Sequence, residues 1–214
     1  TPMPVDECPQ AGPVFTCTGQ SQDECVYDDP TTTFMWQRCL AGVHGEGCEA
    51  GEKLSFSQSG AVTYCSELDH GGYTDWRLPT VDERRSLIRG CEKNEPGGEC
   101  AITHDCSPNT DGPLCNLNGD CPGCQEWAGP GTGGCYLPSE LPFSPQQGGC
   151  GGSRWTSTEL SENAGYVVHG QTANIWGQQM TSESNARCVR GEAGEAPGAC
   201  DGGTLDEAGG GCYA

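Results

Sequence analysis

Seventeen cysteines in a chain of 214 residues constrain this sequence more than any other feature. Hydrophobic residues make up only 34% of the chain, which also carries 34 glycines and 15 prolines. A core this thin does not easily offset the backbone entropy that is lost on folding. Each disulfide, in contrast, adds about 2–4 kcal/mol by restricting the unfolded chain. We therefore expect a disulfide-rich domain from an oxidising compartment, secreted or at the cell surface.

Zinc binding in a cytosolic protein is the alternative use of so many cysteines. Only Cys121 and Cys124, in the sequence CPGC, have CxxC spacing, and a second CxxC at zinc-ribbon spacing is absent. CPGC could also be a redox pair, but it does not lie in a thioredoxin-like βαβ pattern. We favour a Pro-Gly turn that carries two separate structural disulfides. Because seventeen is odd, one cysteine stays free or bonds another chain if the others all pair internally.

The charge and hydropathy of the chain exclude several partners. The net charge of −20 argues against nucleic acid, because like charges repel. There is no run of about 18 apolar residues, so we expect no membrane-spanning segment. The first residues, TPMPVDECP, have neither the charged nor the apolar region of a signal peptide. We interpret the chain as a mature secreted protein whose signal peptide has been removed.

The chain is predicted to contain one domain with additions. Residues 1–20 are predicted to form an extended N-terminal segment, and residues 21–191 the domain itself. Within the domain, residues 91–152 hold eight cysteines among frequent Gly and Pro without periodicity. A structureless loop of that length is improbable in a compact domain, so this part is interpreted as a disulfide-stapled, cysteine-rich insertion. Residues 192–214 form a Gly-rich C-terminal tail.

The regular elements are predicted from periodicity and turn residues. The sequence VYDDPTTTFMWQ (26–37) indicates strand, turn and strand, and residues 55–69 indicate a helix capped by Ser55 or Ser57. Further strands are expected at 153–158, in a hairpin made of GYVVHG and ANIWGQQM, and at 186–190. Helices and short strands in this order predict an α+β fold.

The stretch GGYTDWRLPTVDE (71–83) predicts a corner between a strand and a helix. Pro79 keeps the residue before it extended. Thr80 followed by Glu83 is a capping box, so a helix is expected from Thr80 to about Arg89.

Arg77 within this corner has two interpretations. As a catalytic cation it would need a cleft with a base or nucleophile beside it. As a structural cation it would lie beside Trp76 and donate a fork of hydrogen bonds to a carboxylate or to carbonyls. We favour the structural role.

The scarce cations partly cluster in and just after this helix, at Arg84, Arg85, Arg89 and Lys93. Arg85 and Arg89 are spaced i,i+4 and would share one helix face. A solvated helix surface, paired with nearby acids, is favoured over an anion-binding site.

Calcium is a weaker hypothesis, and no cofactor is required. The sequence DCSPNTDGPLCNLNGD (105–120) brings oxygen-bearing side chains close together, which suits a hard cation. The stretch lacks the glycine and the closing glutamate of a calcium loop, and Asn, Asp and Gly also dominate ordinary turns. The candidate ligands are Asp105, Asn109, Asp111, Asn116, Asn118 and Asp120.

The order of these pieces resembles the Lcl C-terminal-domain family of bacterial collagen-like surface adhesins. The matching motifs are VYDDPTTTFMWQ, AVTYCSEL, GGYTDWRLPTVDE, SRWTSTE and ARCVRG, which cover about 26–90 and 153–191. The resemblance implies an extracellular, disulfide-rich, C-type-lectin-like α+β domain. Two helices would lie against small, twisted, mostly antiparallel sheets with long irregular loops. It also implies a disulfide between Cys65 in the first helix and Cys188 in the last strand.

Enzymatic activity is not expected. The chain has no G-x-S-x-G, P-loop, dinucleotide or HExxH motif. RLPT also begins a segment of the formylglycine-generating oxidases, which are similar in fold. The continuation VDERRSLIRG differs from theirs, and their later GNVWEW signature is missing. A likeness of fold does not carry function.

Assembly is the first of two non-enzymatic hypotheses. In it, the chain is a subunit of a self-assembling filament or coat, and its partners are copies of itself. The β-prone residues Val14, Phe15, Thr16 and Cys17 precede the domain. They would cover the edge of their own sheet or add to the edge of a neighbour. Head-to-tail contacts of the second kind make filaments when they do not close into a ring.

Ligand binding is the second hypothesis. In it, the chain is an adhesin module for a glycan or protein, with calcium as an optional aid. Exposed tryptophans among Trp127, Trp155 and Trp176 would stack on sugar rings.

Overall fold

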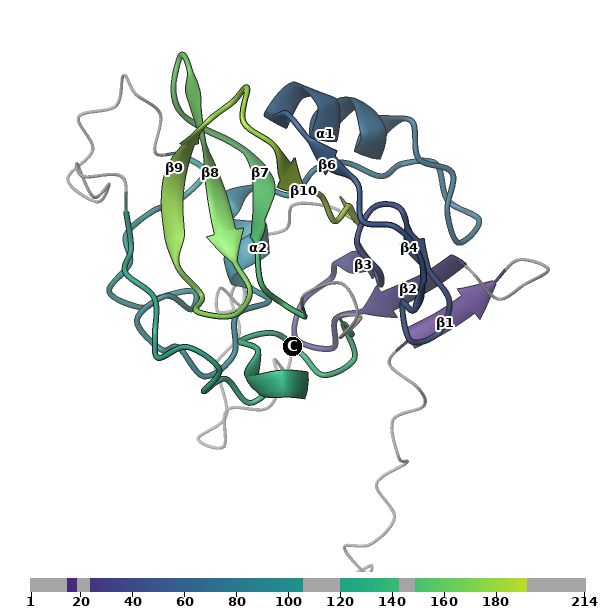
Figure 1. The fold of residues 1–214 in the computed structure, drawn as a ribbon, viewed down its shortest axis with the longest axis horizontal. Helices are drawn as coiled ribbons and strands as arrows, with labels where there is room; N and C mark the ends of the chain where they lie inside the picture. Colours follow the sequence, from purple (N-terminus) through teal and green to yellow (C-terminus); the bar gives the residue numbers. More distant parts are fainter. Residues whose placement is uncertain (1–14, 19–23, 106–119, 143–148, 192–214) are drawn as a thin grey trace, which may run out of the picture.

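A computed structural model describes residues 15–18, 24–105, 120–142 and 149–191, which adopt an α+β fold (Figure 1). The elements in chain order are β1 (Phe15–Thr18), β2 (Glu24–Asp28), β3 (Met35–Gln37), β4 (Val43–His44), β5 (Ala50–Gly51), β6 (Ser55–Phe56), α1 (Gln58–Ser66), α2 (Val81–Arg85), the 3-10 helix η1 (Thr132–Gly134), β7 (Ser153–Ser161), β8 (Ala164–His169), β9 (Ile175–Gln179), β10 (Ser184–Asn185) and β11 (Val189–Arg190). In the part of the chain described, no helix is long and apolar enough to cross a membrane.

The first sheet has the strand order β1-β2-β3-β11, and all of its pairs are antiparallel. The predicted strand, turn and strand at 26–37 are confirmed as β2, its turn and β3. The carboxylate of Asp29 accepts hydrogen bonds from the backbone N–H and the hydroxyl of Thr31, so the side chain stabilises this turn.

The large sheet has the order β6-β10-β7-β8-β9, and β4 pairs with β5 in a small separate hairpin. The predicted hairpin is confirmed as β8 and β9. In Figure 1, β7, β8 and β9 of the large sheet lie at the left, β1 and β2 of the first sheet lie at the lower right, and α1 lies at the upper right. Both helices pack against β7, and α2 also contacts β8.

Both predicted helices are present but shorter than expected. α1 starts after Ser57, whose hydroxyl accepts a hydrogen bond from Gly60 N–H, because Ser55–Phe56 pair with β10 as β6. α2 ends at Arg85 instead of Arg89. The N–H of Arg89 donates to the carbonyl of Tyr136 in the insertion, at 3.1 Å, instead of to a carbonyl of the helix. This contact ends the helix early.

Six disulfides staple the described residues. They join Cys17 to Cys25, Cys39 to Cys48, Cys65 to Cys188, Cys91 to Cys124, Cys100 to Cys121, and Cys135 to Cys150. The two cysteines of CPGC belong to separate bridges, as predicted. The other cysteines lie outside the described residues and are Cys8, Cys106, Cys115, Cys200 and Cys212.

The solvated helix surface predicted for the arginines of α2 is wrong. Arg84 and Arg85 are 1% and 4% exposed. Arg85 donates to three backbone carbonyls of the insertion: Nε to Asn94 at 3.1 Å, Nη1 to Ile102 at 2.6 Å, and Nη2 to Glu95 at 2.8 Å. Its fork therefore fastens the aperiodic insertion to α2, where the sequence pattern suggested only surface charge.

Replacing this arginine tests how much the insertion depends on it. Arg85→Met leaves three backbone carbonyls, two of them in buried hydrogen bonds, without their donor. We expect the free energy of unfolding to fall by about 3 kcal/mol in denaturant titrations. The matched control is Lys93→Met, which removes a partly exposed cation of the insertion and should cost less than about 0.5 kcal/mol. Equal effects of the two changes would contradict the fastening role of Arg85.

Candidate functional site

The corner at 76–83 is built on a fork of hydrogen bonds between the partly exposed Arg77 and the buried Glu83. Arg77 Nη1 and Nη2 donate to the two carboxylate oxygens of Glu83, each at 2.6 Å, and Nη2 also donates to Gly191 O at 3.2 Å. The backbone of Arg77 pairs with Val189 in both directions at 2.9 Å. The residue therefore joins the start of α2 to β11.

Glu83 serves the fork and the helix cap at once. Its Oε2 accepts a hydrogen bond from Thr80 N–H at 2.8 Å, and Thr80 Oγ1 accepts one from Glu83 N–H at 3.3 Å. This capping box satisfies the first N–H groups of α2. Both carboxylate oxygens of Glu83 accept hydrogen bonds, and the residue is 5% exposed. Glu83 is therefore not placed to act as a general base beside Arg77.

The neighbouring residues hold the same corner. Trp76 is buried, and its Nε1 donates to the carbonyls of His70 and Tyr73, both at 3.1 Å. The carbonyl of Pro79 accepts a hydrogen bond from Ser157 N–H at 2.8 Å, which links the corner to β7. The geometry suits a joint between elements more than a reaction centre.

The residues predicted to contact other subunits lie at the edge of the first sheet. Phe15, Thr16 and Cys17 belong to β1, which pairs with β2 of the same chain, whereas Val14 lies outside the described residues. Cys17 faces Cys25 across the pair and is bonded to it. The Phe15 ring lies 3.8 Å from the guanidinium carbon of Arg38, a cation–π contact.

The calcium hypothesis is left with few described residues. Asp105 and Asp120 are described, and the other four candidate ligands lie outside the described ranges. Within these ranges no group of three or more His, Cys, Asp or Glu could hold a metal ion. Asp105 lies 3.4 Å from His104 Nε2, and Nδ1 of that ring contacts Asp82 at 2.6 Å. The hydrogen bond that the His104 ring donates to the Asp82 carboxylate raises the pKa of His104.

The three candidate tryptophans differ in exposure. Trp155 is fully buried and donates from Nε1 to Phe56 O at 2.7 Å, so it belongs to the core. Trp176 is partly buried beside His169, with ring centroids 6.1 Å apart. Trp127, in the insertion, is 51% exposed and is the one of the three that is open to a ligand.

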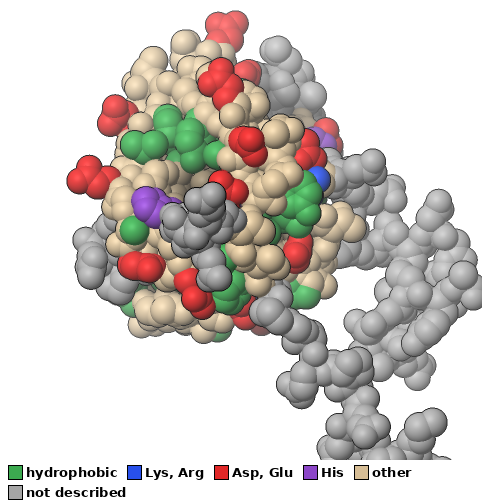
Figure 2. Space-filling model, turned by 90° about the vertical axis from the view of Figure 1, so that its right-hand side faces the viewer, with side chains coloured by type: hydrophobic (Ala, Val, Ile, Leu, Met, Phe, Trp, Pro, Cys, Tyr) green, Lys and Arg blue, Asp and Glu red, His purple; other side chains and the backbone are tan. Residues whose placement is uncertain are grey.

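Interior arginines are the residues that sequence reasoning missed. Arg38, Arg84, Arg154 and Arg187 are each no more than 6% exposed. Asp and Glu side chains are spread over the face shown in Figure 2, where Lys and Arg are almost absent. Arg154 and Arg187 lie within segments predicted as strands, and a scarce cation inside a predicted strand is the signal that could have found them.

The comparisons with known proteins identify the family. The family model described as the Lcl C-terminal domain matches residues 24–190, and the chain therefore belongs to this family. A search of curated proteins finds no match to the chain. The matched range contains the corner, the Cys65–Cys188 bond and the cysteine-rich insertion. It begins at the first residue of β2, so β1 precedes it.

The paired hydrogen bonds of Arg77 to Glu83 can be compared with a second pair, which Arg190 donates to the exposed Asp75. Lysine cannot donate to both oxygens of a carboxylate in parallel, so Arg77→Lys should lower the free energy of unfolding by about 1–2 kcal/mol. Arg190→Lys is the matched control, because Arg190 holds Asp75 by two hydrogen bonds of 2.7 and 3.0 Å. Asp75 is 59% exposed, and the control should cost less than about 1 kcal/mol. Unchanged melting of Arg77→Lys would refute the role of the fork.

Proposed function

We propose that the chain is a non-enzymatic subunit of a secreted bacterial surface assembly, a pilus-like filament or coat built from an adhesin-type domain. Membership of the Lcl C-terminal domain family and six described disulfides fit an extracellular protein. The observation that carries the proposal is that β1 precedes the family domain yet lies at the edge of its first sheet.

The two edges of the first sheet differ. β11 is flanked by Arg77, which pairs with Val189, so that edge is covered. At the opposite edge, β1 pairs with β2 on one side, and no strand of the described residues lies on its other side. An added strand on a sheet edge is the device by which one chain can join another.

Exchange of β1 between copies would preserve every contact that it makes. The edge of β2 in a neighbouring subunit is chemically identical, so Phe15 would meet the neighbour's Arg38 and Cys17 the neighbour's Cys25. Exchange of an identical element adds little strain, and a head-to-tail series of such exchanges gives a filament unless it closes. The family's likeness to C-type-lectin-like folds is part of the proposal, and the bond from Cys65 in α1 to Cys188 before β11 supports it.

The disulfide between Cys17 and Cys25 reports which arrangement exists. In exchanged filaments it joins different chains, so non-reducing SDS gels of filaments seen by electron microscopy should show a ladder of covalent oligomers. Cys17→Ser with Cys25→Ser should collapse the ladder to monomer. Removal of residues 1–20, combined with Cys25→Ser to avoid a free thiol, should abolish the filaments.

The matched control is Cys39→Ser with Cys48→Ser, which removes a bridge of similar loop length inside the family domain. This pair of changes should leave the ladder intact. Wild-type protein that forms no filaments and runs as a monomer without reductant would refute assembly by strand exchange.

A glycan-binding module is the second candidate, favoured by the exposure of Trp127. Its half-exposed indole lies on the cysteine-rich insertion, and an exposed aromatic face can stack on a sugar ring. A side chain of this kind contributes to binding without being needed for the core.

Truncation of Trp127 separates binding from folding. If the chain binds glycans, Trp127→Ala should weaken binding on a glycan array by about tenfold or more, while the free energy of unfolding changes by about 0.5 kcal/mol or less. Leu54→Ala is the control, since Leu54 is 44% exposed elsewhere on the surface. Wild-type protein that binds no glycan on the array would remove this candidate.

A further inference from the structure

Three arginines from distant parts of the chain are buried together in the interior. Arg84 lies in α2, Arg154 in β7 and Arg187 just before β11, and each is no more than 1% exposed. Arg38 after β3 and Lys53 before β6 border them. We name these five residues the basic cluster.

The members lie in one region, because α2 packs against β7 and Arg154 pairs with Asn185, two residues before Arg187. Burial lowers the pKa of Arg84 to about 10. Burial lowers the pKa of Arg154 well below its ordinary value, and repulsion from Arg84 adds to the effect. The pKa of Arg187 is also lowered well below its ordinary value, first by burial and then by repulsion from Arg84, Arg154 and Arg38. The pKa of Lys53 is lowered by burial and then by Arg154.

Arg84 itself has unused side-chain donors. None of the described residues accepts a hydrogen bond from its Nε or Nη1. Its guanidinium carbon lies 5.9 Å from the centre of the Trp36 ring, which offers a weak contact with the cation. Removing a guanidinium from water without an acceptor costs several kcal/mol, and neighbouring positive charges increase that cost.

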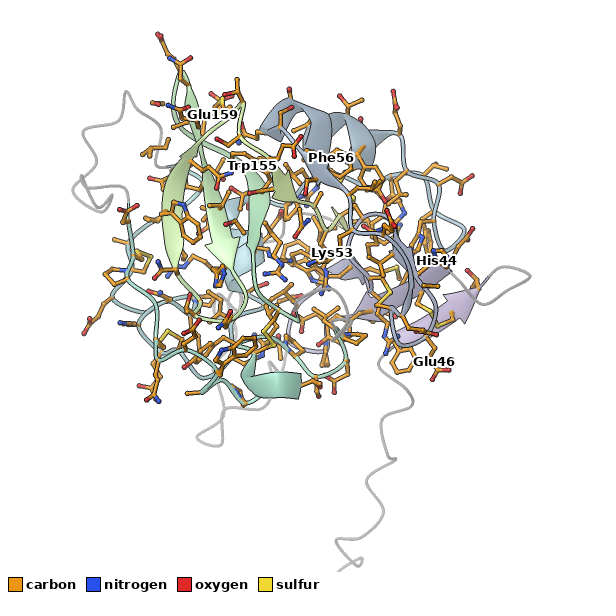
Figure 3. The ribbon with its side chains drawn as sticks, in the orientation of Figure 1. His44, Glu46, Lys53, Phe56, Trp155 and Glu159 are labelled. Carbon is orange, nitrogen blue, oxygen red and sulfur yellow. A yellow bond between two sulfur atoms is a disulfide. The ribbon has the colours of Figure 1, made fainter. Side chains whose placement is uncertain are left out.

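We propose that the basic cluster is a binding site for a carboxylate. The two oxygens of a carboxylate match the parallel donors of a guanidinium, and a negative charge would offset the repulsion within the cluster. Lys53 is the partly exposed member, and it lies near the centre of the view in Figure 3, while Glu46 and Glu159 lie toward the rim. The site does not depend on the assembly proposed above.

The carboxylate can come from two sources. One is a second molecule, such as a small organic acid or an acidic peptide. The other is the chain itself, because residues 192–214 contain Glu192, Glu195, Asp201, Asp206 and Glu207 and no Lys or Arg. Both sources use the same chemistry, and experiment can distinguish them.

The first arm measures binding to the full chain. Citrate is titrated to a few millimolar at constant ionic strength, with chloride as the balancing anion, and binding is followed by calorimetry and by the melting temperature. If the source is a second molecule, citrate should bind and raise the melting temperature, since a ligand that binds only the folded state stabilises it. Arg84→Met should weaken the affinity about tenfold or more.

The second arm neutralises the acidic tail in the full chain. The five carboxylates are changed together, as Glu192→Gln, Glu195→Gln, Asp201→Asn, Asp206→Asn and Glu207→Gln. If the tail is the source, the wild type should ignore citrate, whereas the neutralised chain should melt a few degrees lower and recover in citrate. Arg84→Met should then remove that recovery.

Two further variants keep the test decisive. Lys53→Met changes a partly exposed member and serves if Arg84→Met does not fold; it should also weaken citrate binding severalfold. Arg190→Met removes an arginine that is already paired with Asp75 and should leave citrate binding unchanged. The proposal is overturned if neither the wild type nor the neutralised chain responds to citrate, or if Arg190→Met lowers the response as much as the cluster variants.

Discussion

The fold depends on the short segment around Cys188, where three parts of the molecule are joined. Cys188 is bonded to Cys65 of α1, and the next residue, Val189, pairs with Trp36 of β3 on one side and with Arg77 on the other. The bond closes a loop of sequence separation 123, so it removes much of the freedom of the unfolded chain. Cys188 and Val189 therefore hold the first sheet, α1 and the corner before α2 in place.

Hydrogen bonds from arginine side chains hold segments together that the small apolar core does not. Arg77 holds a carboxylate and a carbonyl at the corner, and Arg85 holds three carbonyls of the insertion. Acids cover the surface instead, which keeps the −20 charge in water. Arg38, Arg85 and Arg154 donate hydrogen bonds to backbone carbonyls of irregular segments, which no sheet or helix satisfies. The placement of arginines inside and acids outside explains how a chain rich in glycine and loops holds its insertion in a defined position.

Local signals predicted part of the fold, and tertiary contacts decided the rest. The capping box at Thr80 and the β8–β9 hairpin have signatures within a few residues, so the sequence predicted them. The end of α2 was missed because Tyr136, far along the chain, competes for the N–H of Arg89. The burial of Arg85 was missed because its acceptors lie in an aperiodic insertion. The partner of β1 cannot be predicted from sequence, since the edge of β2 is the same in every copy.

Strand exchange at β1 is the central functional claim, and isotope mixing tests it most directly. Reduced, unfolded chains with ¹⁴N and ¹⁵N labels are mixed in equal amounts, refolded, oxidised and digested without reductant. Exchange predicts that about half of the Cys17–Cys25 peptide pairs join a light to a heavy peptide. The Cys65–Cys188 pairs, which lie inside one domain, should stay uniformly labelled. Uniform labelling of the Cys17–Cys25 pairs from assembled protein would contradict the claim.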